Sequence, residues 1–439
     1  MNVRISHRVM GRITIASVVA MTMLVGGMPA AYAADVTAGP QQPDVVSILK
    51  GYEEYYKPSN AYDKNDPGSF GNGTVVDKTV LAHDDDYVQK INAAAARGSD
   101  GTTPTAQQQR ALIDSDYQMS ETLPDSMGSV IGSWFTQGLN DGKLAKTAEL
   151  LTQTDSSTGW SDSLLADFLD TGTAKTTFNH PRPYVDRTNG GYVAAGLVKS
   201  VDIVKVGAWT DSQGRHHDPN YAGMLTSGSF PSGHTTYAYS GGIGLATLFP
   251  QLGTEIVTRA SEAGNNRIVL GVHYPLDIMG GRIDGEVANT ALWSDQNFRE
   301  SKLMPAYNEL QGYIANECVS NHVVAASDDV YDTVEQCVTK LGANADKGYA
   351  NAFVDPVSTK PVTDRASAID AYTARMTYGF DQDASKAGRA PVVPQGAGNL
   401  LLTAFPTLTD AQRQQVLKAS EIASGYPLDD SSQGYLRLN

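Results

Sequence analysis

The chain has 439 residues, 41% of them hydrophobic, and a net charge of −15 at pH 7. Its length and composition are those of a globular protein with a large buried core. The acidic balance excludes binding to nucleic acid or to an anionic membrane through overall charge. No run of about 18 apolar residues follows residue 33, so we expect no transmembrane segment in the mature chain.

The first 33 residues have the pattern of a secretory signal peptide. Arg4, Arg8 and Arg12 precede an apolar stretch, and Ala31-Tyr32-Ala33 supplies small residues at a cleavage site. We expect cleavage near Ala33, which changes the net charge from −15 to −18 and places the mature protein in the periplasm, in the cell envelope or outside the cell. A retained N-terminal anchor is the alternative.

Helical patterns dominate the chain after an extended lead-in at residues 34–44. Apolar residues recur at helical spacing, and Gly, Pro or Asn ends each run. The expected helices before residue 190 cover residues 46–56, 86–98, 106–119 and 126–154. Alternating strand patterns are scarce, and the best strand or loop candidate covers residues 190–209.

Two long core helices are expected over residues 235–249 and 254–293, with small residues that allow close packing. The helical pattern continues over 300–345. Proline-rich connectors then surround short helices, one of them over 407–424 with a Thr or Asp cap. We therefore expect an all-α domain at 45–344 and a C-terminal extension of unknown role at 345–439.

Cys318 and Cys337 are the two cysteines of the chain. An even pair this close in an exported protein indicates a disulfide. Closing a loop of this length stabilises the fold by about 3 kcal/mol. Two free buried thiols are the alternative, and neither interpretation makes these cysteines catalytic.

Two histidines have neighbours that suggest chemistry. Asp277 follows His273 by four residues, so on a helix its carboxylate would lie on the same face and fix one ring nitrogen of the imidazole. His234 follows Ser232 and Gly233 at the start of an expected helix. Amides at such a helix start are unpaired donors that can bind an anion.

A basic pair completes the pattern. Lys175 and Arg182 are seven residues apart in AKTTFNHPRPY, and Arg267 precedes His273 by six residues. Arginine offers a planar fork that matches phosphate oxygens, and lysine adds a point charge. Each piece alone has a structural alternative, namely a solvated loop, a helix cap or a surface pair.

The three pieces together resemble the signature of the type 2 phosphatidic acid phosphatase (PAP2) superfamily, which includes bacterial class A acid phosphatases and vanadium-dependent haloperoxidases. Gaps of 47 residues (184–230) and 31 residues (235–265) separate the pieces. The likeness covers about residues 110–300. Asn266 stands where the family usually has a serine.

The resemblance implies a fold and a reaction. The fold would be a helical bundle of the acid phosphatase/haloperoxidase type. The protein would be a soluble acid phosphatase that hydrolyses small phosphate monoesters through a phosphohistidine, without metal or cofactor. The implied roles are a nucleophile (His273) with its orienting carboxylate (Asp277), a general acid (His234), and phosphate ligands at Lys175, Arg182, Ser232, Gly233 and Arg267.

Other interpretations stay open at this level. The same motifs serve vanadate-dependent haloperoxidases, in which vanadate occupies the phosphate site as cofactor; in a phosphatase vanadate would act as an inhibitor. A lipid phosphate or envelope pyrophosphate could be the substrate, and residues 345–439 could be a binding module. The segments His83–Tyr87 and His216–Asp218 could suggest a metal, but solvated loops are favoured because no second cluster stands at ligand spacing. The oligomeric state is left open.

Overall fold

The computed structural model describes residues 39–99, 101–116, 122–152, 163–341, 349, 361–429 and 433–439. They form an all-α fold, as the sequence predicts. The strands among them make two short antiparallel pairs, β1 (Tyr56–Pro58) with β2 (Gly73–Val75) and β3 (Trp209–Thr210) with β4 (His216–His217). The predicted signal peptide and residues 34–38 of the predicted lead-in lie outside the described residues.

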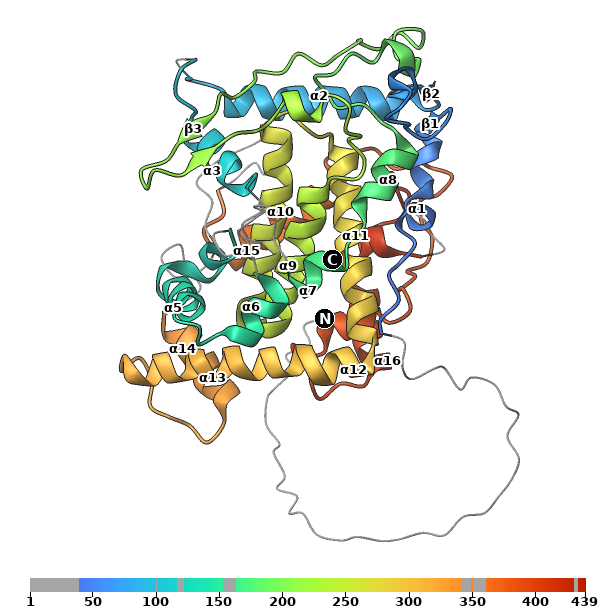
Figure 1. The fold of residues 1–439 in the computed structure, drawn as a ribbon. Coiled ribbons are helices and arrows are strands. Elements are labelled where there is room, and N and C mark those ends of the chain that lie inside the picture. The colour runs from blue at the N-terminus through green and yellow to red at the C-terminus, as the bar shows by residue number, and fades with distance from the viewer. Residues whose placement is uncertain are drawn as a thin grey trace, which may run out of the picture. The chain divides into compact units, whose positions relative to one another are not determined.

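Three long helices form the centre of the fold: α9 (Gly233–Leu248), α10 (Gly253–Val269) and α11 (Pro275–Ser294). They run side by side in Figure 1. Nearly every residue of α11 is buried, as expected for a helix that is covered on all sides. This central position puts the start of α11 in the interior of the protein.

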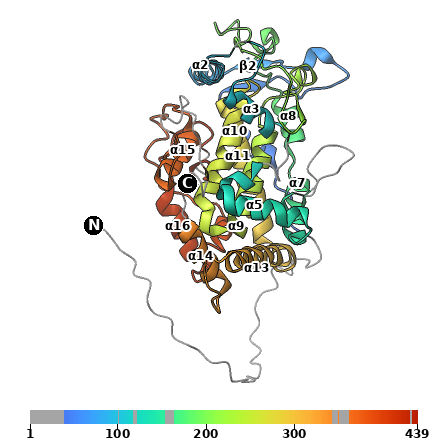
Figure 2. The same ribbon diagram turned by 90° about the vertical axis from the view of Figure 1, so that its left-hand side faces the viewer.

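The remaining helices surround the central three. In Figures 1 and 2, α2 crosses one end of the central helices and α13 crosses the other end. The surrounding helices are α1 (Val45–Ile48), α2 (Lys78–Ala95), α3 (Ala106–Asp114), α5 (Gly128–Asn140), α6 (Ala145–Leu151), α7 (Leu164–Asp167), α8 (Thr171–Phe178), α12 (Gln296–Phe298), α13 (Met304–Ser320), α14 (Val330–Leu341), α15 (Arg365–Thr377) and α16 (Asp410–Ser420). None of the helices in the described part of the chain combines the length and apolarity needed to cross a bilayer.

The predicted single helix over 254–293 is wrong, because the chain breaks between α10 and α11 at residues 270–274. Gly271 has a φ of +69°, a left-handed backbone conformation that residues other than glycine rarely adopt. Pro275 is the first residue of α11, where its missing N–H costs no helical hydrogen bond. His273 therefore lies in a turn between two helices and not on a continuous helix.

The predicted helix over 126–154 is also interrupted. A 3₁₀ helix (Pro124–Met127) precedes α5, and α6 follows after a turn. Gly142, with a φ of +67°, lies just beyond the end of α5, where a glycine often ends a helix. The last two residues of the predicted helix lie outside the described residues.

The strand or loop candidate at 190–209 is irregular apart from its first residue, Gly190, which ends a 3₁₀ helix (Thr188–Gly190), and its last residue, Trp209, which begins β3. The side chain of Asn92 in α2 takes the place of a neighbouring strand. It accepts a hydrogen bond from the Val204 amide at 2.8 Å and donates to the Val204 carbonyl at 3.2 Å. This one side chain satisfies both backbone groups of Val204.

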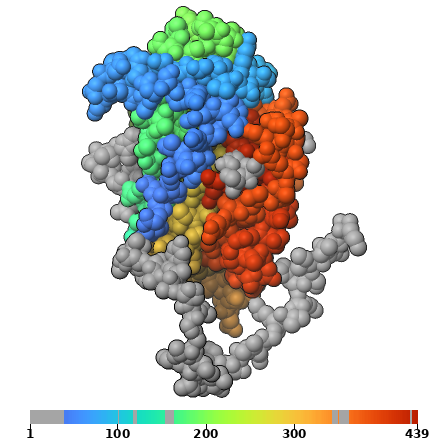
Figure 3. Space-filling view, turned by 90° about the vertical axis from the view of Figure 1, so that its right-hand side faces the viewer, coloured from blue at the N-terminus to red at the C-terminus, as the bar shows by residue number. Residues whose placement is uncertain are grey.

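The C-terminal residues pack against the same core. Arg375 of α15 donates to Ser261 Oγ of α10 at 3.1 Å, and Arg282 of α11 donates to the Leu436 carbonyl. Figure 3 shows the orange and red C-terminal residues beside the blue N-terminal ones. Gly39–Asn439 is one compact unit.

The two cysteines lie on neighbouring helices, Cys318 in α13 and Cys337 in α14, and form a disulfide in the structure.

We expect Gly281→Ala to destabilise the protein. A Cβ on Gly281 would lie 2.6 Å from the Ser232 carbonyl oxygen and 2.8 Å from Thr235 Cβ, where α11 crosses the start of α9. The free energy of unfolding should fall by about 2 kcal/mol, because backbone must shift. Urea denaturation measures the change. Gly312→Ala on α13 is the matched control, because its Cβ meets nothing within 4 Å; equal effects of the two substitutions would contradict this account.

Candidate active site

The three sequence motifs meet at one cavity of about 520 Å³. The first motif supplies residues from α8 and the loop after it, the second supplies the start of α9, and the third supplies the end of α10 and the turn before α11. Six of the eight predicted catalytic and phosphate-binding residues line the cavity: Lys175, Arg182, Gly233, His234, Arg267 and His273.

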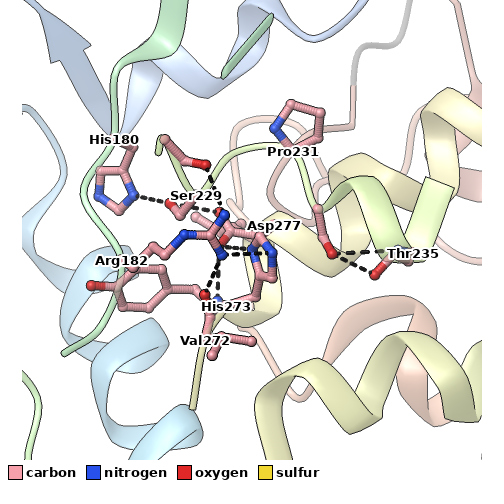
Figure 4. Close-up of polar contacts among 12 residues, drawn as sticks. His180, Arg182, Ser229, Pro231, Thr235, Val272, His273 and Asp277 are labelled. Atoms are coloured by element: carbon pink, nitrogen blue, oxygen red, sulfur yellow. Dashed lines mark hydrogen bonds and ion pairs between the residues drawn. The ribbon is translucent and has the colours of Figure 1, made fainter. Parts of the chain in front are cut away.

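His273 is held at both ring nitrogens (Figure 4). Its Nδ1 lies 3.0 Å from Asp277 Oδ2, and its Nε2 lies 3.0 Å from Arg182 Nη1. A guanidinium can only donate, so Nε2 is the acceptor and Nδ1 carries the proton. Burial and the positive charge of Arg182 lower the pKa of His273, which favours the neutral imidazole. Nε2 is therefore a lone-pair nitrogen beside the cavity.

Asp277 accepts two further hydrogen bonds. The Tyr274 amide donates to Oδ2 at 2.9 Å, and Ser229 Oγ donates to Oδ1 at 3.3 Å. Burial raises the pKa of Asp277 to about 7, while the Tyr274 amide and the nearby Lys175 charge act in the opposite direction. These donors favour the ionised form of Asp277, which accepts the hydrogen bond from His273 Nδ1.

Two cations of the first motif hold the loop that leads into α9. Lys175 Nζ donates to the carbonyl oxygens of Gly228 and Ser229, each at 3.3 Å, and to that of Pro231. Arg182 Nε donates to the Ser227 carbonyl at 3.0 Å. Burial and Arg182 lower the pKa of Lys175. Both side chains therefore organise the loop as well as lining the cavity.

The cavity combines positive charge with helix-start amides. Arg267, at the end of α10, is only 1% exposed and lines the cavity together with Gly233 and His234. The amides of the first turn of α9 have no acceptor within the helix. Three cations and a helix N-terminus around one cavity form an environment that favours an anion.

Ser232 has a different position from the other predicted phosphate ligands. It is the N-cap of α9, and its Oγ accepts from the Thr235 amide at 3.4 Å and from Thr235 Oγ1 at 2.9 Å. Its own amide donates to the Asp277 carbonyl at 3.0 Å. In the structure Ser232 thus joins the start of α9 to the start of α11, and Gly233 is the residue that lines the cavity.

His234 lines the cavity from the first turn of α9. Its Nε2 donates to the Ser115 carbonyl at 3.0 Å, just beyond the C-terminal end of α3. Burial and the positive charge of Arg267 lower the pKa of His234, and the bond to Ser115 opposes this shift. A bound dianion would also oppose it, so the imidazole can hold a proton when the cavity is occupied.

Asn266, which stands where a serine is usual in the resembled family, does not line the cavity. Its Nδ2 donates to Asp114 Oδ2 at 2.7 Å, and Arg259 holds the same carboxylate at 2.6 and 3.0 Å. This buried cluster fixes the end of α3 beside Ser115. Sequence motifs do not reveal Asp114, Arg259 and Ser115, because the partners of these residues are far away along the chain.

The acidic segment considered as a metal site has structural contacts instead. Asp84 accepts from the Leu276 amide at 3.0 Å, and Asp85 pairs with Arg187 at 2.6 and 3.0 Å. His217 pairs with Asp116 at 2.6 Å. Within the described ranges, no group of three or more His, Cys, Asp or Glu side chains could hold a metal ion.

The part of the chain that contains the three motifs is similar to known proteins. Residues 163–301 match the model of the PAP2 superfamily. The acid phosphatase of Zymomonas mobilis subsp. mobilis is 33% identical over 139 residues, which are 31% of this chain and 43% of that protein. The non-specific acid phosphatase of Salmonella typhimurium is 28% identical over 134 residues, 30% of this chain and 53% of that protein. The chain spans about half the length of these curated relatives.

We expect inorganic phosphate to bind in this cavity. Arg267→Gln should weaken its binding at least about tenfold, because a buried cation of the anion site is lost. Titration calorimetry at constant ionic strength measures the affinity, and circular dichroism checks the fold. Arg365→Gln is the matched control, since Arg365 pairs with Glu255 and does not line the cavity. Unchanged binding by folded Arg267→Gln would contradict the assignment.

Proposed function

We propose that this chain, whose residues 163–301 match the PAP2 superfamily, hydrolyses phosphate monoesters by way of a phosphohistidine at His273. The observation that carries the proposal is the hydrogen bonding of His273. Asp277 accepts a hydrogen bond from Nδ1 of His273. Nε2, the acceptor nitrogen of the same ring, lies beside a cavity lined by Lys175, Arg182 and Arg267. Such an arrangement combines a nucleophile, its orienting group and charge stabilisation for phosphoryl transfer.

In the first step, Nε2 of His273 attacks phosphorus and forms a P–N bond while the P–O bond to the leaving group breaks. The three cations and the α9 amides stabilise the negative charge on the equatorial oxygens. Arg182 exchanges its contact with Nε2 for the phosphoryl oxygens. His234 donates a proton to the departing alkoxide, and Asp277 stabilises the charge that develops on His273.

In the second step, water attacks the phosphohistidine. His234, now neutral, accepts a proton from this water. The P–N bond breaks, its electron pair returns to Nε2 of His273, and inorganic phosphate leaves. The balance is one ester and one water converted to one alcohol and one phosphate. The protein's own cations neutralise the charge, so the proposed reaction uses no metal or cofactor.

A bell-shaped pH dependence follows from the proposed roles. His234 must hold a proton to act as the acid, and that form is lost as the pH rises through its pKa. Asp277 must be ionised to orient His273, and that form is lost as the pH falls through its pKa. The negative charge of the bound substrate raises the pKa of His234. The rate should therefore form a bell, with its alkaline limb set by His234 and its acid limb set by Asp277, whose pKa burial raises to about 7.

The proposed working compartment is outside the cytoplasm, and the proposed substrates are small phosphorylated compounds. The sequence pattern of residues 1–33 supports export. N-terminal sequencing of the protein recovered from the producing cells should give a chain that begins at Ala34. An intact N-terminus at Met1 on the recovered protein would overturn the export proposal.

The direct test of the function is hydrolysis of p-nitrophenyl phosphate by the purified protein in the presence of a chelator. We expect activity that His273→Ala lowers about 1000-fold or more, because the nucleophile is removed. His216→Ala, an exposed histidine in β4 that does not line the cavity, should be fully active. Full activity in His273→Ala, or activity that the chelator abolishes, would refute the proposed mechanism.

His234→Ala should affect substrates according to their leaving groups. An alkoxide needs a proton as it leaves, whereas p-nitrophenolate is stable without one. We therefore expect the substitution to lower the single-turnover rate for glycerol phosphate by about 100-fold or more. The fold-loss for p-nitrophenyl phosphate should be smaller than this by a factor of at least about ten. Equal losses on both substrates would argue that His234 is not the general acid.

A further inference from the structure

His180 lies in the first motif, between Lys175 and Arg182, but it does not line the cavity. Its side chain is completely buried, and both ring nitrogens have side-chain partners. Nδ1 lies 2.8 Å from Ser229 Oγ, and Nε2 is in close contact with the Tyr192 hydroxyl. Figure 4 shows the contact between His180 and Ser229, with Asp277 beside Ser229.

The direction of these hydrogen bonds follows from two groups: the Asp277 carboxylate, which only accepts when ionised, and the neutral His180 ring, which has one proton. Ser229 has one hydroxyl proton and donates it to Asp277 Oδ1, which is a pure acceptor when ionised. Ser229 Oγ must therefore accept from Nδ1–H of His180. Burial and Arg187 lower the pKa of His180, so its imidazole is neutral and has a single proton. Nε2 then accepts from the Tyr192 hydroxyl.

We infer that His180 and Tyr192 are positioning residues for His273. Hydrogen bonds run from Tyr192 to His180, from His180 to Ser229 and from Ser229 to Asp277, and every donor in this chain points toward the carboxylate. The chain keeps Asp277 ionised and turned toward Nδ1 of His273. The catalytic consequence rests on the function proposed above, whereas the hydrogen-bond directions do not.

The backbone around His180 is built to hold this geometry. Asn179 ends α8 in a left-handed conformation, with a φ of +47°, which turns the chain after the helix. The Asn179 side chain accepts from the Gly71 amide at 3.0 Å and donates to the Ser69 carbonyl at 2.7 Å. The Ser229 amide donates to the His180 carbonyl at 2.7 Å, so main chain and side chain join the same two residues.

Tyr192 is fixed from its far side. The guanidinium of Arg187 lies 4.0 Å from the centre of the Tyr192 ring, and Arg187 forms a bidentate pair with Asp85 of α2. Arg187 also donates to the Tyr274 hydroxyl at 3.0 Å, next to His273 in the chain. The acidic segment of α2 thus supports the far end of the hydrogen-bond chain.

The first test reads the hydrogen-bond directions without any reaction. In ¹⁵N NMR spectra of the full protein, the ring nitrogens of His180 and His273 should both have the shifts of a neutral imidazole with the proton on Nδ1. Assignment uses His180→Gln and His273→Gln. A charged His180, or one with its proton on Nε2, would overturn the inference whether or not the protein hydrolyses phosphate esters.

The second test reads the effect on Asp277 through the pH dependence of kcat/KM for p-nitrophenyl phosphate. Ser229→Ala removes a donor to the carboxylate, so its pKa rises and the acid limb should move up by about one pH unit. Tyr192→Phe acts from further away, and we expect a smaller upward shift with kcat lowered about threefold. A substitution that only disturbed the structure would lower the activity without moving the acid limb of the pH profile.

Tyr56→Phe is the matched control. Tyr56 is also fully buried and its ring packs on His180 with 4.8 Å between centres, but its hydroxyl donates to the Gly71 carbonyl, outside the chain that leads to Asp277. Its acid limb should coincide with that of the wild type. An unmoved limb in folded Ser229→Ala, or an equal shift in Tyr56→Phe, would overturn the positioning role. A wild type without any phosphatase activity would instead refute the proposed function and leave the NMR result to decide the hydrogen-bond chain.

Discussion

The buried carboxylate of Asp277 is the group around which the site is organised. A charge in the interior is costly unless hydrogen bonds and opposite charges compensate it. Here the compensation comes from three segments of the chain: the turn before α11, the loop before α9 and the cations of the first motif. The break between α10 and α11 is required for this, because it turns the Tyr274 amide and the His273 ring toward the same carboxylate.

Lys175 and Arg182 have neutral hydrogen-bond acceptors, whereas three other buried arginines bind carboxylates. Arg187, Arg259 and Arg282 are paired with carboxylates, so their charge is largely neutralised. Lys175 and Arg182 donate instead to backbone carbonyls, a serine hydroxyl and an imidazole. These partners orient a cation without cancelling its charge. An acidic protein can in this way hold a local site for an anion.

The sequence predicted the all-α fold, and the resemblance of its three motifs to a known family predicted six of the residues that line the cavity. It predicted the closeness of His273 and Asp277 for the wrong reason, since a turn and the first turn of α11 bring them together rather than a continuous helix. Gly271 and Pro275 were the available signals for that break. Ser229, His180 and Asp114 could not be found in the same way, because each acts through a partner at least 48 residues distant along the chain.

The central claim is that His273 is the nucleophile, and trapping the intermediate tests it most directly. The protein would be mixed with p-nitrophenyl phosphate, quenched in alkali within milliseconds and digested for mass spectrometry. Alkali preserves a phosphohistidine. Our account predicts a phosphoryl group on His273, and more of it in His234→Ala, where the water has lost its base. Rapid hydrolysis with no phosphoryl group on His273, or with one on a different residue, would contradict the account.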